Sequence, residues 1–186
     1  MKNYSIKPIS RKEAEHYILE IHYAKRWPVI SYYFGLFKNE QLVGVCTYGP
    51  PASPWLCKGV CGEKYRKQVI ELNRLALLNN LKNEASFLIG NSLKMLPEGM
   101  IVVSYADTAQ GHVGVVYKAT NWLYTGATKP RTDMASKTGG HSRHHSGDRT
   151  NRVFRSSKHR FVTFTGNKKQ KKELRKALKY PVTEYV

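Results

Sequence analysis

The stretch that most constrains the fold is residues 104–126, SYADTAQGHVGVVYKATNWLYTG. It continues the apolar run MIVV, so residues 100–107 predict a strand that ends at Asp107, and the glycines around His112 precede a short helical segment. In open α/β sheets, ligands bind beyond the carboxyl ends of strands, where helix N-termini offer free N–H groups. We therefore expect a functional site where this strand gives way to the helix.

The N-terminal third predicts one helix, two strands and a long loop. Residues 10–26 place Ser10 and Glu13 at capping-box spacing and repeat apolar residues at helical intervals, so they predict a helix that ends before Pro28. Residues 31–49 read as two strands joined by a turn. The following residues 50–66, PPASPWLCKGVCGEKYR, are rich in Pro and Gly and predict a loop.

The middle of the chain alternates strands with helices. Residues 67–78 predict a strand and residues 79–96 a helix, and together with the segment around Asp107 they give a βαβα core in which pairing should be predominantly parallel. A late strand is expected within residues 151–166, followed by a basic helix within residues 167–181. At 186 residues, the chain is expected to form a single α/β domain over residues 1–186.

Charge is the strongest compositional signal. The chain has 31 Lys and Arg against 13 Asp and Glu, a net charge of +18, and residues 129–186 hold 16 of the basic residues but only 4 acidic ones. Such a field attracts polyanions, of which nucleic acid is the commonest in a cell. We expect a basic DNA-binding loop and strand region at residues 128–160 and a basic helix and tail at residues 167–186. The predicted phosphate contacts are Lys137, Arg143, Arg149, Arg152, Lys158 and Arg160.

Several features favour a cytoplasmic protein without a membrane partner. No apolar run approaches the length needed to span a bilayer, and residues 1–17 lack the apolar core of a secretory signal. The three cysteines, Cys46, Cys57 and Cys61, are odd in number and closely spaced, so reduced thiols are expected rather than a disulfide framework.

Three residues near the strand end could carry chemistry. Asp107 follows an apolar strand, where a half-buried carboxylate can act as a base or metal ligand, although Asp is also a common helix N-cap. Tyr117 lies in the short helix and could equally be an ordinary core tyrosine. His112 could assist either residue or hydrogen-bond the backbone.

Arg74 is a further candidate because it sits among apolar residues of a predicted strand. A buried guanidinium needs a carboxylate, a phosphate or a bound donor molecule as its partner. Glu71 could neutralise it, but a spacing of three residues puts the two side chains on opposite faces of a regular strand unless a bulge intervenes. Asn83 and Ser86, near the start of the next helix, could bind polar groups of a donor.

These residues carry a family resemblance. The run YKATNW at residues 117–122, followed by Gly126, is similar to the end of the acyltransferase fold of the GNAT superfamily, with Asn-Trp in place of Gly-Phe. The succession SYAD, GHVG, YKATNW more closely resembles the phage Mom family. Three further segments resemble it too: IHYAKRWP at residues 21–28, ELNRLAL at residues 71–77, and residues 158–182. The resemblance spans nearly the whole chain and implies a GNAT-like central mixed β-sheet flanked by helices, with a basic, loop-rich C-terminal extension.

The resemblance also implies a function. It points to a DNA-modifying transferase that adds a carbamoylmethyl (glycinamide-like) group to N6 of adenine in phage DNA and so protects that DNA from host restriction, in the cytoplasm of the bacterial host. Double-stranded DNA is the expected partner. The implied catalytic residues are His22, Tyr23, Asp107 and Tyr117, and the first three could also hold iron or another transition metal. The implied donor-binding residues are Arg74, Asn83, Ser86, Ser104, His112 and Asn121.

The sequence departs from typical acetyltransferases at the site for the donor. Their [QR]-x-x-G-x-[GA] segment cradles the pyrophosphate of coenzyme A, whereas the corresponding stretch here is LLNNLKNEAS, which has no glycine. Without a backbone nest, acetyl-CoA is a poor candidate, and the sequence leaves the donor unidentified.

An adenine inside a duplex must leave the stack to reach an enclosed site, and an aromatic side chain can receive it. The aromatic candidates are Trp55, Tyr105, Tyr48 and Trp122, of which Trp55 is expected to be the most exposed. Two other functions stay open on the sequence alone: a non-catalytic basic nucleic-acid-binding protein, and a GNAT acetyltransferase acting on another amine.

Overall fold

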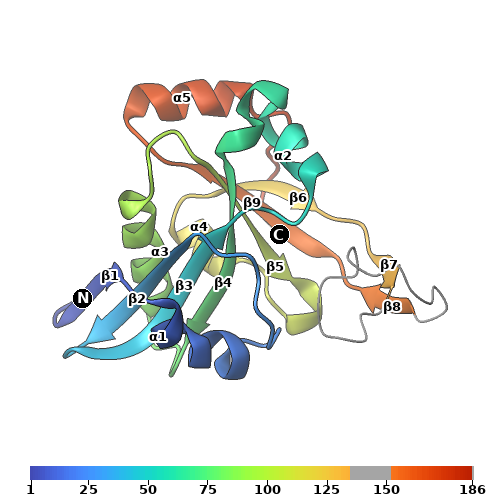
Figure 1. Ribbon diagram of the computed structural model, residues 1–186. Helices are drawn as coiled ribbons and strands as arrows, with labels where there is room; N and C mark the ends of the chain where they lie inside the picture. The colour runs from blue at the N-terminus through green and yellow to red at the C-terminus, as the bar shows by residue number, and fades with distance from the viewer. Residues whose placement is uncertain (135–151, 186) are drawn as a thin grey trace.

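A seven-stranded mixed sheet forms the centre of the structure (Figure 1). The computed structural model describes residues 1–134 and 152–185. The strands lie in the order β1 (Tyr4–Pro8), β2 (Tyr32–Lys38), β3 (Gln41–Gly49), β4 (Val69–Leu77), β5 (Ile101–Asp107), β9 (Lys158–Phe164) and β6 (Leu123–Ala127). A separate ribbon pairs β7 (Arg131–Met134) with β8 (Arg152–Arg155).

The prediction of predominantly parallel pairing is wrong. Among the described strands only β4 and β5 pair in parallel, and every other neighbouring pair is antiparallel. The cause is long-range: β9, from the C-terminal part of the chain, inserts between β5 and β6 and runs antiparallel to both. The strands and helices expected at residues 31–49, 67–78, 79–96 and 100–107 are confirmed.

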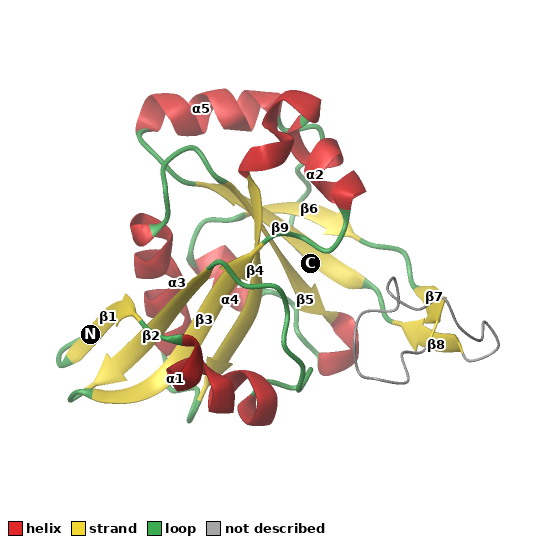
Figure 2. Cartoon of the chain, viewed as in Figure 1, coloured by secondary structure: helices red, strands yellow, loops and turns green. Residues whose placement is uncertain are grey.

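Helices cover both faces of the sheet (Figure 2). Because side chains alternate along β5, Val102 and Ala106 join the core beneath one set of helices, while Ile101 and Val103 join the core beneath another. The first set is α3 (Glu84–Met95) and α4 (Val115–Ala119), and the second is α2 (Pro54–Cys61) and α5 (Lys168–Ala177). Helix α1 (Arg11–His16) and the π-helical turn η1 (Tyr17–Ile21) pack on the same side as α2, against Val45 and Ala76.

The first helix begins as predicted but ends earlier. Ser10 and Glu13 form the capping box, with the Glu13 N–H donating to Ser10 Oγ and the Ser10 N–H donating to the Glu13 carboxylate. The helix then widens into η1 and ends at Ile21 instead of running toward Pro28. The His22 side chain contributes to this ending, because its Nδ1 accepts the N–H of Ala24 at 3.1 Å and so satisfies a backbone donor outside the helix.

The prediction of a loop at residues 50–66 is wrong, because α2 and the 3₁₀ helix η2 (Glu63–Gln68) occupy most of it. Ser53 caps α2 by accepting the Leu56 N–H, and Pro54 stands at the first helical position, where no N–H is needed. Burial of Leu56 and Val60 then stabilises the helix.

The late strand predicted within residues 151–166 divides at Ser156 and Ser157 into β8 and β9. The basic helix is confirmed as α5, where Asn167 and Gln170 form a second capping box and Leu174 is buried. The predicted phosphate contacts Lys137, Arg143 and Arg149 lie outside the described residues.

The three cysteines are free thiols, as expected. Within residues 1–134 and 152–185, no helix has the length and apolar character that crossing a bilayer would require.

Candidate active site

The site is built where β4 and β5 separate. The two strands pair over only three positions, the last of which joins Glu71 to Val103, although β4 continues to Leu77 and β5 to Asp107. We call the opening between residues 72–77 and residues 104–107 the fork. Helix α3 connects the two strands on one side of the sheet (Figure 1), η1 and α2 pack on the other side, and β9 pairs with the far edge of β5.

The rings of His22, Tyr23 and His112 lie together at the site. The rings of His22 and Tyr23 stack with centroids 4.5 Å apart, and the Tyr23 ring meets the His112 ring edge-on at 5.9 Å. Burial, followed by the cations Arg74, His112, Lys158 and Arg26, lowers the pKa of His22 to about 3. His22 is therefore neutral, and because its Nδ1 accepts a hydrogen bond, its proton is on Nε2.

A bulge in β4 places the side chains of Glu71 and Arg74 on the same face of the sheet. Thr47 of β3 pairs with Arg74, while Tyr48 pairs with Leu72, so Asn73 is the extra residue. The bulge reverses the alternation after Leu72 and turns Glu71 and Arg74 to the same face. The Arg74 guanidinium donates to the carbonyls of Asn73 at 2.5 Å and Arg26 at 3.0 Å, while its Nε has no partner among the described residues.

Glu71 is the site residue that sequence reasoning missed. It is the last residue of β4 to pair with β5, and it forms no ion pair with any described residue. Burial raises the pKa of its carboxyl to about 7, although Arg74 and Lys158 act in the opposite direction. A carboxyl that titrates near neutrality is suited to general acid–base chemistry. The signal in the sequence was an acidic residue inside an apolar strand.

Asp107 ends β5 with both carboxylate oxygens engaged. Oδ1 accepts the Ser156 hydroxyl at 2.5 Å and the Ala109 N–H at 3.1 Å, and Oδ2 pairs with Lys158 Nζ at 2.6 Å. Burial acts to raise the pKa of Asp107, but the hydrogen bonds from Lys158 and Ser156 outweigh it and hold the pKa below its usual value. Asp107 is thus an ionised N-cap that ties β5 to β9.

A metal held by His22, Tyr23 and Asp107 does not fit this arrangement. Nδ1 of His22 accepts the Ala24 N–H, so the other ring nitrogen carries the proton and presents no lone pair to a metal, and the charge of the Asp107 carboxylate is already balanced by Lys158. Within the two described ranges, no cluster of three His, Cys, Asp or Glu side chains is arranged to hold an ion. We assign no step to a metal.

Tyr117 approaches the fork from the other face of the sheet. Ser104 Oγ donates to the Leu72 carbonyl at 2.9 Å and lies 2.7 Å from the Tyr117 hydroxyl. Because the single proton of Ser104 goes to the carbonyl, Tyr117 donates to Ser104. Burial raises the pKa of Tyr117 to about 12, so the phenol stays protonated, and its ring stacks on Phe161 at 4.6 Å.

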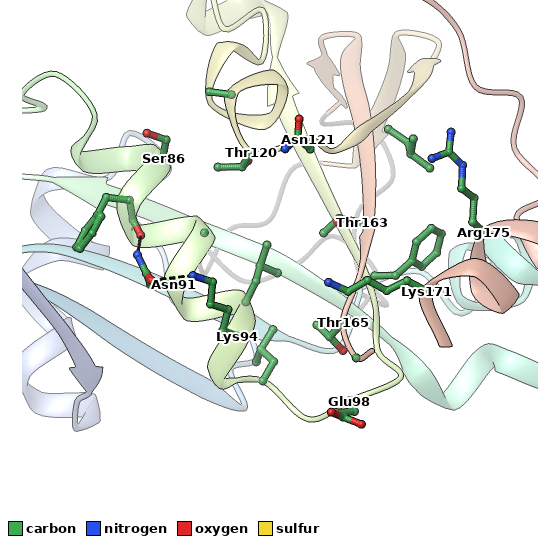
Figure 3. Close-up of a pocket in the computed structure, with 18 of the residues that line it drawn as sticks. Ser86, Asn91, Lys94, Glu98, Thr120, Asn121, Thr163, Thr165, Lys171 and Arg175 are labelled. Atoms are coloured by element: carbon green, nitrogen blue, oxygen red, sulfur yellow. Dashed lines mark hydrogen bonds between the residues drawn. The ribbon is translucent and has the colours of Figure 1, made fainter. Parts of the chain in front are cut away.

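The remaining predicted donor residues lie elsewhere. Asn83, Ser86 and Asn121 line a hollow of about 1090 Å³ between α3, the α4–β6 turn, β9 and α5 (Figure 3). Lys94, Lys171 and Arg175 line the same hollow. The six residues predicted to bind the donor therefore lie in two places: Asn83, Ser86 and Asn121 at this hollow, and Arg74, Ser104 and His112 at the fork.

The start of α3 holds a buried acidic side chain. Glu84 is 1% exposed, and its carboxyl group accepts the Leu81 N–H at 2.9 Å and the Tyr4 hydroxyl at 2.8 Å. A backbone donor of the loop before α3 is thus occupied by the protein itself.

The predicted DNA contacts that can be described differ in environment. Trp55 on α2 is 80% exposed, as expected, whereas Tyr48 and Trp122 are buried and Tyr105 is half-buried. Arg152 is exposed on β8, and Lys158 is paired with Asp107.

Arg160 is committed to the protein itself. It donates twice to Thr125 and lies 3.6 Å above the ring of Tyr180. Arg160 therefore fixes the C-terminal tail against β6.

Comparisons with known proteins place this architecture. The solved structures that it resembles are acetyltransferases: the ribosomal-protein-S5-alanine acetyltransferase of Vibrio fischeri has a TM-score of 0.57 at 8% identity, covering 90% of this chain and 96% of that one. A GNAT-family acetyltransferase of Bacillus cereus has a TM-score of 0.50 at 11% identity, covering 88% and 99%. At these identities the likeness shows the fold alone, and the fold is GNAT-like.

Sequence comparison goes further than the fold. The chain is 33% identical over 132 residues to the methylcarbamoylase mom of Escherichia phage Mu, an alignment that covers 68% of this chain and 55% of that protein. The chain thus spans about half the length of this curated relative. The profile of the Mom protein family matches residues 3–185. With nearly its entire length matched, the chain belongs to the Mom protein family.

Proposed function

We propose that this protein is a DNA-modifying transferase that adds a carbamoylmethyl group to N6 of adenine in phage DNA and thereby protects that DNA from host restriction. The family membership supports this function, as does the similarity to a protein named methylcarbamoylase in a phage. The net charge of +18 fits a polyanionic substrate such as double-stranded DNA.

The observation that carries the proposal is that two acid–base groups reach the fork from opposite faces of the sheet. Glu71, with a pKa of about 7, reaches the fork from one face of the sheet, and the protonated Tyr117 reaches it from the other. The charge of Glu71 also contributes to raising the pKa of Tyr117 across the opening. In the proposed reaction, the bond from N6 to the transferred carbon forms as the bond to the leaving group breaks. Glu71 takes the proton of N6, and Tyr117 gives a proton to the leaving group.

The neighbouring residues position these two groups. Arg74, with an unpartnered Nε, can bind a carbonyl or anionic group of the donor, and the neutral His22 can donate a hydrogen bond from Nε2. Asp107 holds Lys158 near Glu71, where the ammonium favours the ionised carboxylate. None of these roles requires Asp107 to exchange a proton.

A coenzyme A thioester fits this chain poorly. Its pyrophosphate would meet the loop before α3, where the Leu81 N–H already serves Glu84. The reading as an ordinary acetyltransferase is weakened accordingly, although the fold is shared.

The proposal is tested by restriction of plasmid DNA from bacteria that express the protein. Plasmid from these cells should resist an endonuclease whose recognition site contains adenine, and should be cut by one whose site contains only guanine and cytosine. Plasmid from cells that express Tyr117→Phe at the same level should be cut by both enzymes, while Tyr65→Phe on the exposed η2 segment should behave like the wild type. Equal cutting of wild-type and Tyr117→Phe plasmid by the adenine-dependent enzyme would contradict the proposal.

A further inference from the structure

The ribbon of β7 and β8 is tied to the site but is not part of the sheet. It projects beyond the end of the sheet at which β5 stops (Figure 1). Its base is clamped there: Ser156 donates to Asp107, and the carbonyl of Ser157 accepts from Thr108. The Thr128 N–H donates to the carbonyl of Lys158, and the Lys158 N–H donates to the Thr128 hydroxyl. Whatever binds the ribbon is therefore held next to Asp107.

The arginines on the two faces of the ribbon differ in whether they form ion pairs with described residues. Paired residues of antiparallel strands point to the same side, so Arg131, Arg155 and Asp133 share one face, where Asp133 forms ion pairs with both arginines. The other face carries Phe154 opposite Thr132, together with Arg152. Phe154 is 68% exposed, and Arg152 forms no ion pair with any residue of the described ranges.

A phenyl ring exposed to water is unfavourable, whereas a phenyl ring beside a guanidinium is suited to contact with nucleic acid. Aromatic rings stack on bases whatever the sequence, arginine pairs with phosphate, and a two-stranded ribbon fits the major groove of B-DNA. A base that leaves the duplex also exposes the faces of its former neighbours, which an apolar wedge can cover.

From this geometry, and resting on the proposed function, we propose that the face of the ribbon formed by Thr132, Arg152 and Phe154 contacts duplex DNA beside the target adenine. Phe154 stacks in the space that the adenine vacates, and Arg152 contacts a neighbouring phosphate. The clamp at Ser156 holds this contact in register with the fork.

The test measures binding of the full chain to two labelled duplexes by fluorescence anisotropy, one intact and one with a single abasic site in place of an adenine. The wild type should bind the abasic duplex more tightly, because no base there has to be unstacked. Phe154→Ala should lose about fivefold to 100-fold in affinity and most of this preference, without a change in the salt dependence of binding. Arg152→Gln should instead lower the slope of log affinity against log salt by about 1.

Val153→Ala is the matched control, since Val153 lies on the opposite face of the same strand and is 40% exposed. Circular dichroism checks that each variant is folded. The inference is overturned if Phe154→Ala binds both duplexes like the wild type, or if Val153→Ala loses as much affinity as Phe154→Ala. Failure of the wild type to bind either duplex would overturn the proposed function together with this inference.

Discussion

The raised pKa of Glu71 predicts an unusual dependence of stability on pH. In the folded chain its carboxyl has a pKa of about 7, against an ordinary value of 4.5. Between these two values the folded state binds a proton that the unfolded state has lost, so the free energy of unfolding falls as pH rises from 4.5 to 7. Every tenfold change in proton affinity corresponds to about 1.4 kcal/mol, which makes the loss at most about 3 kcal/mol.

Glu71→Gln removes this titration while keeping the shape of the protonated side chain. We expect the variant to match the wild type near pH 4.5 and to exceed it at pH 8, by up to about 3 kcal/mol or roughly 6–12 °C in Tm. Thermal unfolding followed by circular dichroism across this range measures the difference. Glu15→Gln, which neutralises an exposed carboxylate on α1, is the matched control. Parallel stability curves for Glu71→Gln and the wild type would refute the reasoning.

Three further predictions concern the surroundings of the fork. Tyr117→Phe keeps the stacking on Phe161 but removes the hydrogen bond to Ser104, so it should lower the free energy of unfolding by about 1–2 kcal/mol, measured by urea titration. Gly114→Ala should unfold at a markedly lower temperature, by the equivalent of about 2 kcal/mol or more in calorimetry, because the glycine has a φ of +82° and an added Cβ would come within 2.1 Å of Phe161. Trp55→Ala should leave the Tm unchanged, because its side chain is 80% exposed, yet weaken binding to duplex DNA in an anisotropy titration. A stable Gly114→Ala or a clearly destabilised Trp55→Ala would count against the structure.

Local patterns predicted the elements whose stability is local. The capping box at Ser10 marked the start of the first helix correctly, because its hydrogen bonds join residues three apart. Helix α2 was missed because its prolines were read as breakers, although Pro54 follows the N-cap Ser53 and therefore starts the helix.

The site itself depended on contacts that no local pattern encodes. The family resemblance grouped His22 and Tyr23 with Asp107, whereas the contact of Tyr23 with the ring of His112 comes from the structure alone. The role of Glu71 was not predicted, because it depends on where β4 and β5 part and on the bulge at Asn73, which is a matter of register between strands.

In the basic C-terminal region, too, the partners of individual side chains could not be predicted from the sequence. Phosphate contacts were predicted at Lys158 and Arg160 among others, but Arg160 is stacked on Tyr180 and Lys158 is paired with Asp107. Charge counts describe the field of the whole molecule, whereas the partner of each side chain is fixed by tertiary packing.

The measurement that tests the account most directly is mass spectrometry of nucleosides from plasmid DNA of bacteria that express the wild type or Glu71→Gln at matched levels. The account predicts an additional adenine nucleoside in the wild-type sample, with the mass increase of a carbamoylmethyl group on the base, and its loss in the Glu71→Gln sample. Standard nucleosides alone in the wild-type sample, or an undiminished modified adenine in the Glu71→Gln sample, would contradict it.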